Sequence, residues 1–124
     1  MSEALLRIED LVVTLGTRQG EQEFVHGFEL CVQPGETLGV VGESGSGKTL
    51  TMLAVMRLLS PPLAMSRGAV RLEGEDLAAL TETEMRDVRG RRVAMVYQDP
   101  MTSLNPLMRV GDQIVEAMTA HGVD

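Results

Sequence analysis

The chain has 124 residues, of which 44% are apolar and 23% are charged, a composition typical of a globular domain with one hydrophobic core. Its formal net charge of −7 argues against binding to nucleic acid or directly to anionic lipid, because both need a basic face. The apolar runs are too short to cross a membrane, and the N-terminus does not resemble a secretion signal. Cys31 is the only cysteine, so an internal disulfide is impossible, and we expect it to be buried in a strand.

Three apolar segments in the first 41 residues are predicted to be β-strands. Residues 5–15 and 24–32 are rich in Val, Leu and Phe, and the polar stretch 16–23 between them is predicted to be a turn. A second turn is predicted at 33–36, where Pro presets φ and Gly permits a positive φ. The third segment, residues 37–41, is short and continuously apolar, as are strands buried on both faces of a parallel sheet.

Helices and strands alternate in the rest of the chain. A helix is predicted from Lys48 to Leu59, because Pro61 and Pro62 stop it. Further elements are expected as strands at 68–72 and 92–97, a short helix opening at the capping box Thr81-Glu82-Thr83-Glu84, and a helix at 110–118. This order predicts an α/β fold in one domain, with an N-terminal antiparallel sheet beside a partial parallel core.

Residues 42–49 read Gly-Glu-Ser-Gly-Ser-Gly-Lys-Thr and match the phosphate-binding pattern G-x-x-x-x-G-K-[ST]. The glycines let the backbone wrap closely around a polyphosphate, so that several N–H groups converge on its oxygens. The helix that follows adds its N-terminal dipole. Lys48 is the only lysine of the chain, and it falls where the motif needs one. The predicted strand before the loop and helix after it favour nucleotide binding over a simple glycine-rich turn.

The expected ligands of this loop are ATP and Mg²⁺. Lys48 is predicted to reach the β- and γ-phosphates as a catalytic residue, and the Thr49 hydroxyl to coordinate Mg²⁺. A GTPase-type Asn-Lys-x-Asp segment cannot be present, because the single lysine is already used. The residues predicted to contact the nucleotide are Gly42, Glu43, Ser44, Gly45, Ser46, Gly47, Lys48, Thr49 and Leu50.

A second motif covers residues 95–106, Met-Val-Tyr-Gln-Asp-Pro-Met-Thr-Ser-Leu-Asn-Pro. An apolar strand ending in Gln-Asp-Pro, followed by Ser-Leu-Asn-Pro, resembles the Q-loop of ABC ATPases. The variant is similar to that of the oligopeptide, dipeptide, glutathione and nickel importer group. Gly-Glu-Thr-Leu-Gly at 35–39 and Val-Arg-Gly at 88–90 are also similar to that group. The resemblance is collinear from Leu5 to His121.

The resemblance implies a P-loop NTPase fold and ATP hydrolysis that drives import of peptides or similar solutes. It implies that Gln98 contacts Mg²⁺ and the attacking water. The implied partners are transmembrane permease subunits and a second ATPase subunit, at the cytoplasmic face of the membrane, with residues 101–108 near the permease. The Leu-Ser-Gly-Gly-Gln signature, the Mg²⁺-binding Asp with the catalytic Glu, and the switch His are absent from the sequence. We therefore expect residues 1–124 to be part of a nucleotide-binding domain, up to its helical subdomain, without ATP turnover of their own.

Two other hypotheses remain open. Residues 93–97 followed by Asp99 could be the strand and metal-binding acid of a compact P-loop kinase, although this leaves Gln98 without a role. The chain could also bind nucleotide or a partner without turnover.

Base recognition is a further open point, because Leu15 stands where the family has an aromatic residue that stacks on adenine. Phe24 and Phe28 are expected in the core.

Overall fold

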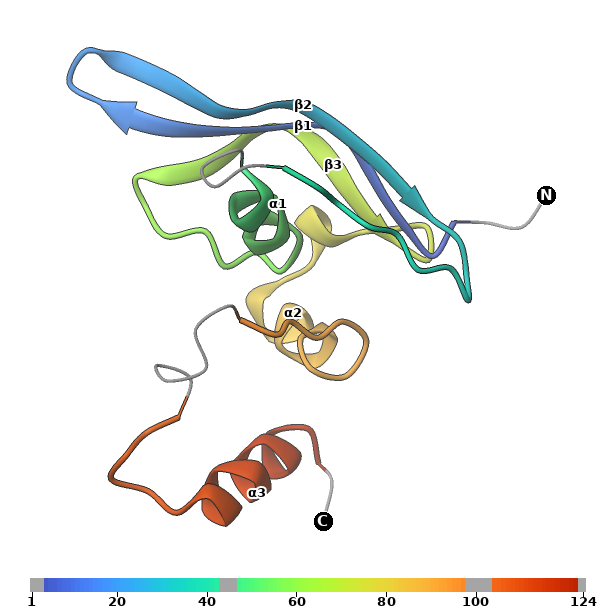
Figure 1. Cartoon of the computed structure of the whole chain (residues 1–124), viewed down its shortest axis with the longest axis vertical. Coiled ribbons are helices and arrows are strands. Elements are labelled where there is room, and N and C mark those ends of the chain that lie inside the picture. Colours follow the sequence, from blue (N-terminus) through green and yellow to red (C-terminus); the bar gives the residue numbers. More distant parts are fainter. Residues whose placement is uncertain (1–3, 43–46, 98–103, 123–124) are drawn as a thin grey trace. The chain divides into compact units, whose positions relative to one another are not determined.

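The computed structural model describes residues 4–42, 47–97 and 104–122. It forms two compact units, residues 1–81 and 82–124, which are considered separately below. The first unit holds a four-stranded sheet and helix α1, and the second holds helices α2 and α3 (Figure 1).

The sheet of the first unit is antiparallel, as predicted. It consists of β1 (Leu6–Thr17), β2 (Gly20–Val32), β3 (Leu63–Leu72) and β4 (Glu75–Asp76), in the order β2-β1-β3-β4. The connection from β1 to β2 is much shorter than the predicted turn. Residues 14–17 pair with residues 20–23, because backbone hydrogen bonds extend the ladder beyond the apolar residues that the sequence pattern detects.

The core lies between the inner face of the sheet and helix α1 (Figure 1). Its largest fully buried side chains in β1 are Ile8, Leu11, Val12 and Val13. Cys31 is exposed rather than buried, so that prediction was wrong. The reason is its register: Cys31 pairs with Arg7, which is also exposed, and the two side chains therefore belong to the outer face of the sheet.

The three long strands are distorted at one level by Asp10 and two glycines. Asp10 has φ 45° at an irregularity of β1, and Gly27 of β2 and Gly68 of β3 have φ 73° and 104°. A Cβ at position 68 would lie 2.5 Å from the carbonyl oxygen of Asp10 and 2.6 Å from that of Glu9. Such close backbone contact leaves room only for glycine in this part of β3.

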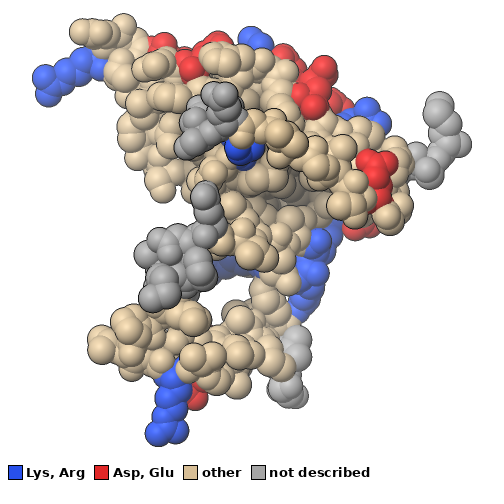
Figure 2. Space-filling model, in the orientation of Figure 1, with Lys and Arg blue, Asp and Glu red and all other residues tan. Residues whose placement is uncertain are grey.

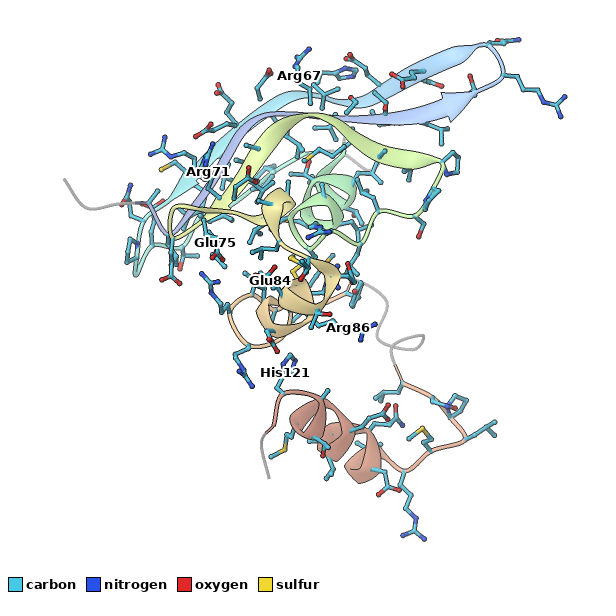
Figure 3. The ribbon with its side chains drawn as sticks, turned by 180° about the vertical axis from the view of Figure 1, so that it is seen from behind. Arg67, Arg71, Glu75, Glu84, Arg86 and His121 are labelled. Carbon is cyan, nitrogen blue, oxygen red and sulfur yellow. The ribbon has the colours of Figure 1, made fainter. Side chains whose placement is uncertain are left out.

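Charged side chains cover the outer face of the sheet. Arg67 projects on the side away from α1 (Figure 3) and donates from Nε and Nη2 to the Asp10 carboxylate, at 2.7 and 3.2 Å. This hydrogen bond, together with the charge of Asp10, raises the pKa of the Arg67 guanidinium. Both side chains are more than half exposed, so the pair contributes little to stability. Figure 2 shows further acidic side chains over the strands.

Helix α1 (Lys48–Val55) is shorter than the predicted helix. It ends because Met56 is its C-cap and Arg57 takes a left-handed conformation with φ 54°. The Arg57 guanidinium turns back to donate to the carbonyls of Leu77 and Leu80, at 3.1 and 2.8 Å. These bonds tie the end of α1 to the 3₁₀ turn η1 (Leu77–Ala79), a tertiary constraint that local sequence periodicity does not reveal.

Two predicted strands are not hydrogen-bonded into a sheet. Residues 37–41 have no strand assignment, and Leu38 and Val41 are 45% and 98% exposed. Residues 92–97 make only one isolated bridge, between Arg89 and Val93. A short apolar strand needs a neighbour to satisfy its backbone groups, and none of the strands in the described residues is paired with either segment.

The second unit contains α2 (Glu82–Val88) and α3 (Val110–Ala120). His121 follows α3 and points towards the turn after α2 (Figure 3), where a Cβ on Gly90 would lie 2.7 Å from its Nε2 atom. Arg91 donates from Nη2 to the His121 carbonyl. These contacts hold the end of α3 against the turn after α2.

Replacing Gly68 by Ala tests the distortion of the strands. We expect Gly68→Ala to lower the free energy of unfolding by about 2–4 kcal/mol, because the new methyl group meets two carbonyl oxygens and the φ is unfavourable. Gly16→Ala in β1 is the matched control, since a Cβ there meets nothing within 4 Å. Urea denaturation measures both variants, and equal stabilities would contradict the described geometry.

Candidate functional site

The start of helix α1 is pressed against strand β2 at Gly47. This residue is the N-cap of α1 and has φ 94°, a left-handed conformation that glycine adopts without strain. A Cβ at this position would lie 3.1 Å from both the carbonyl oxygen of Phe24 and Cγ2 of Val25. The last glycine of the phosphate-loop motif is therefore required by its dihedral angle and by its close approach to β2.

Thr51 makes two hydrogen bonds to Gly47 at the start of α1. Its hydroxyl donates to the Gly47 carbonyl at 2.8 Å, and its backbone N–H donates to the same oxygen at 2.9 Å. The residue is only 4% exposed. Thr51 was not among the predicted site residues, although a polar residue four positions after Gly47 in an otherwise apolar helix could have indicated it.

Lys48 bridges the two sides of the loop. Its side chain is half-buried, and Nζ donates to the carbonyl oxygen of Gly42. The following Thr49 is exposed and Leu50 is half-buried. The first turn of α1 contains no acidic residue, so the positive potential of the helix N-terminus is not neutralised there. Together these features favour an anion.

A cleft of about 500 Å³ opens beside this helix start, within the usual size range of small-molecule sites. The cleft is lined by residues 24–29 of β2, by residues 40–42, and by Gly47, Lys48 and Thr51. The structure thus brings together Gly42, Gly47 and Lys48, which the sequence predicted, with β2 residues that it did not. Phe24 and Phe28 are half-buried in this lining, so the expectation that they are core residues was wrong.

Several predicted site residues lie outside the described residues, and their roles stay predictions. Glu43, Ser44, Gly45 and Ser46 belong to the loop itself, and Gln98 and Asp99 to the second motif. Within residues 4–42, 47–97 and 104–122, no three His, Cys, Asp or Glu side chains are placed to hold a metal ion. In the same ranges, no helix is long and apolar enough to cross a membrane.

The Thr51 hydroxyl can be tested by amide hydrogen exchange. Thr51→Val keeps the shape of the side chain but removes one bond to the Gly47 carbonyl, which weakens the first turn by about 1 kcal/mol. We expect the Thr51 amide to exchange about fivefold faster in this variant. Thr51→Ser retains the hydroxyl and should exchange at that amide as the wild type does. An unchanged rate in Thr51→Val would show that the hydroxyl does not stabilise the helix start.

Comparisons with known proteins identify the family. A protein-family model with the description "ABC transporter" matches residues 25–123 of the chain. The chain is 48% identical over 118 residues to the oligopeptide transport ATP-binding protein OppD of Bacillus subtilis, covering 94% of this chain and 33% of OppD. It is 42% identical over 120 residues to OppD of Escherichia coli, covering 97% and 35%. The chain therefore spans about a third of the length of these relatives.

A solved structure agrees with this result. The chain is 27% identical to a bacterial Atm1-family ABC exporter with ATP bound, with a TM-score of 0.55, covering 73% of this chain and 15% of the exporter. Since the family model spans most of the chain, including Gly47 and Lys48, the chain belongs to the ABC transporter family.

Proposed function

We propose that residues 1–124 are part of a nucleotide-binding domain whose ATP hydrolysis powers solute import through a membrane transporter. The observation that carries this proposal is the start of α1, where Lys48 and a helix N-terminus without acidic residues face a cleft. A nucleoside triphosphate fits this environment, since its phosphates are anionic and its remainder fills an adjacent hollow. Membership of the family supports this function over a compact kinase.

In this site the chain binds and orients the nucleotide. Residues 42–50 would offer backbone N–H groups to the phosphates, and Lys48 would bring its ammonium to the β- and γ-phosphates. The exposed Thr49 hydroxyl would be a ligand for Mg²⁺, and Gln98 would hold the metal and the attacking water. When bound, ATP would supply the γ-phosphoryl group, which passes to water as ADP leaves, and Mg²⁺ would neutralise charge on the phosphates.

The transported solute is proposed to be a peptide or a similar small molecule, because the relatives from Bacillus subtilis and Escherichia coli are named oligopeptide transport ATP-binding proteins. The proposed partners are permease subunits and a second ATPase subunit, at the cytoplasmic face of the membrane. Exposed apolar side chains of the second unit support a permease contact: Leu104, Leu107 and Met108 are 48%, 93% and 40% exposed.

The loop that carries these side chains is held by Gln113 of α3. Its amide nitrogen donates to the carbonyls of Asn105 and Met108 at 3.0 and 3.1 Å, and its oxygen accepts from the Asn105 N–H at 2.9 Å. Asn105 in turn accepts from the Leu107 N–H at 2.9 Å through its side chain. The loop is therefore ordered by polar contacts while its apolar residues remain available to a partner.

Lys48→Ala tests the proposed nucleotide site. We expect the dissociation constant for MgATP to rise at least about thirtyfold, because a charged hydrogen bond to phosphate is lost. Titration calorimetry on the full chain measures this, and a thermal melt checks that the variant remains folded. Arg18→Ala, at the exposed hairpin connection, removes an equal charge and should bind as the wild type does. Retained affinity in Lys48→Ala would refute the assignment.

Leu107 tests the proposed permease contact. Because Cys31 is exposed, the experiment starts from the complete transporter subunit carrying Cys31→Ser. Leu107→Cys should then form a cross-link to the permease in the assembled transporter, with a short reagent that joins a thiol to an amine. Thr17→Cys, at the exposed end of β1, is the comparison and should not do so. Cross-linking from Thr17→Cys alone would contradict this partner surface.

A further inference from the structure

Helix α3 is not held in place by a buried apolar face. None of its residues is buried in the part of the chain that the structure describes, and Val110, Ile114 and Val115 are more than half exposed. A helix of 11 residues is marginal in water by itself, because most helical stability in proteins comes from tertiary packing. The position of α3 therefore depends on the contacts made at its two ends.

At its N-terminal end, α3 is joined to the loop that carries Leu107. The Gln113 side chain makes three hydrogen bonds to the backbone of Asn105 and Met108, and the Asn105 side chain accepts from the Leu107 N–H. A hollow of about 640 Å³ is lined both by this loop and by α3 as far as Ala120. The loop is thus fixed relative to the helix, and a shift of α3 would move Leu107 with it.

At the C-terminal end, the ring of His121 lies against the turn after α2 (Figure 3). A Cβ on Gly90 would lie 2.7 Å from Nε2 of this ring and 3.5 Å from Cδ2 and Cε1, so the ring occupies the space that a side chain at position 90 would need. Nδ1 of His121 is buried and has no hydrogen-bond partner among the described residues. The ring is therefore held by packing rather than by a hydrogen bond of its buried nitrogen.

Backbone hydrogen bonds close the turn that receives this ring. The Val88 carbonyl accepts from the N–H groups of Arg92 and Val93, at 2.9 and 3.0 Å, and the Gly90 N–H donates to the Val93 carbonyl at 2.6 Å. Gly90 has φ 85°, a left-handed conformation that favours glycine. The side chain of Val88 is buried. The turn therefore offers α3 a fixed surface without a side chain at the point of contact.

We propose that His121 is a positioning residue, which holds α3 against the turn after α2 and thereby sets where Leu107 meets the permease. This inference rests on the proposed permease contact. Arg91 supports the same attachment, but it donates to the backbone carbonyl of residue 121, and that carbonyl is present whatever side chain stands there. The ring of His121 is thus the part of the attachment that a substitution removes.

Amide hydrogen exchange on the full chain tests the attachment itself. We expect His121→Ala to speed exchange of the α3 amides at least about threefold, because a helix that loses a packed contact opens more often. His121→Phe keeps a planar ring that needs no hydrogen bond, and it should exchange as the wild type does. His121→Gln keeps a polar group but no ring and should behave as His121→Ala. Thr119→Ala, at an exposed position of α3, is the matched control and should not exchange faster.

Gly90→Ala tests the same contact from the turn. Its methyl group would displace the His121 ring, so the α3 amides should again exchange faster. In a chain that already carries His121→Ala, the methyl group meets no ring. The double variant should therefore change the exchange rate by less than the product of the two separate changes. Independent effects of the two substitutions would overturn the inference.

Cross-linking then tests the position of Leu107. In the complete subunit carrying Cys31→Ser and Leu107→Cys, His121→Ala should lower the yield of the cross-link to the permease at least about threefold. His121→Phe should restore the yield, and MgATP binding should stay as in the wild type in both variants.

The outcomes separate the two proposals. If Leu107→Cys forms no cross-link while the His121 ring is intact, the proposed permease contact is wrong. If it cross-links equally well in His121→Ala, or if the α3 amides of that variant exchange as in the wild type, the inference is overturned. A loss of MgATP binding in His121→Ala would also overturn it, because the ring would then act on the whole fold rather than on the position of α3.

Discussion

The contact between Gly47 and strand β2 is the constraint on which the candidate site depends. A left-handed residue without a side chain lets the end of the loop approach the Phe24 carbonyl, and the same residue accepts two hydrogen bonds from Thr51. Without this approach, helix α1 could not begin beside the hairpin, and Lys48 would not share a cleft with β2. The chemistry of the loop therefore depends on a contact between the backbones of two segments more than twenty residues apart.

The sequence predicted those features that depend on local composition. The apolar residues of β1 and β2 and the turn at residues 33–36 lie where residue type alone constrains the backbone. The phosphate-loop motif and the residues after it also identified the family, which the comparisons confirmed. Local chemistry was sufficient for these predictions because each motif is contiguous in the sequence.

What the sequence did not reveal depends on pairing between distant segments. The exposure of Cys31 follows from its register opposite Arg7, and the bulge at Phe24 follows from the pairing of β1 with β2. Residues 37–41 were predicted to be a strand because most of them are apolar. They do not form one in the structure, because a strand also requires a hydrogen-bonded neighbour. The role of Thr51 was missed for a similar reason. Its hydroxyl donates to the Gly47 carbonyl, and a residue pattern does not show which carbonyl a hydroxyl group reaches.

The hydrogen bond from Lys48 to the Gly42 carbonyl has a consequence for the thermodynamics of ligand binding. In the described structure, the Gly42 carbonyl accepts a hydrogen bond from an ammonium N–H group that could otherwise donate to a phosphate oxygen. Binding through that proton is an exchange of acceptors, so its net gain is smaller than the strength of the new contact. The same bond restricts the lysine side chain in the described structure, so that a phosphate bound at this position would cost less side-chain entropy. In the proposed site, the Gly42 carbonyl would thus compete with phosphate for the Lys48 ammonium, lowering the enthalpy gained on binding while it fixes the position of the side chain.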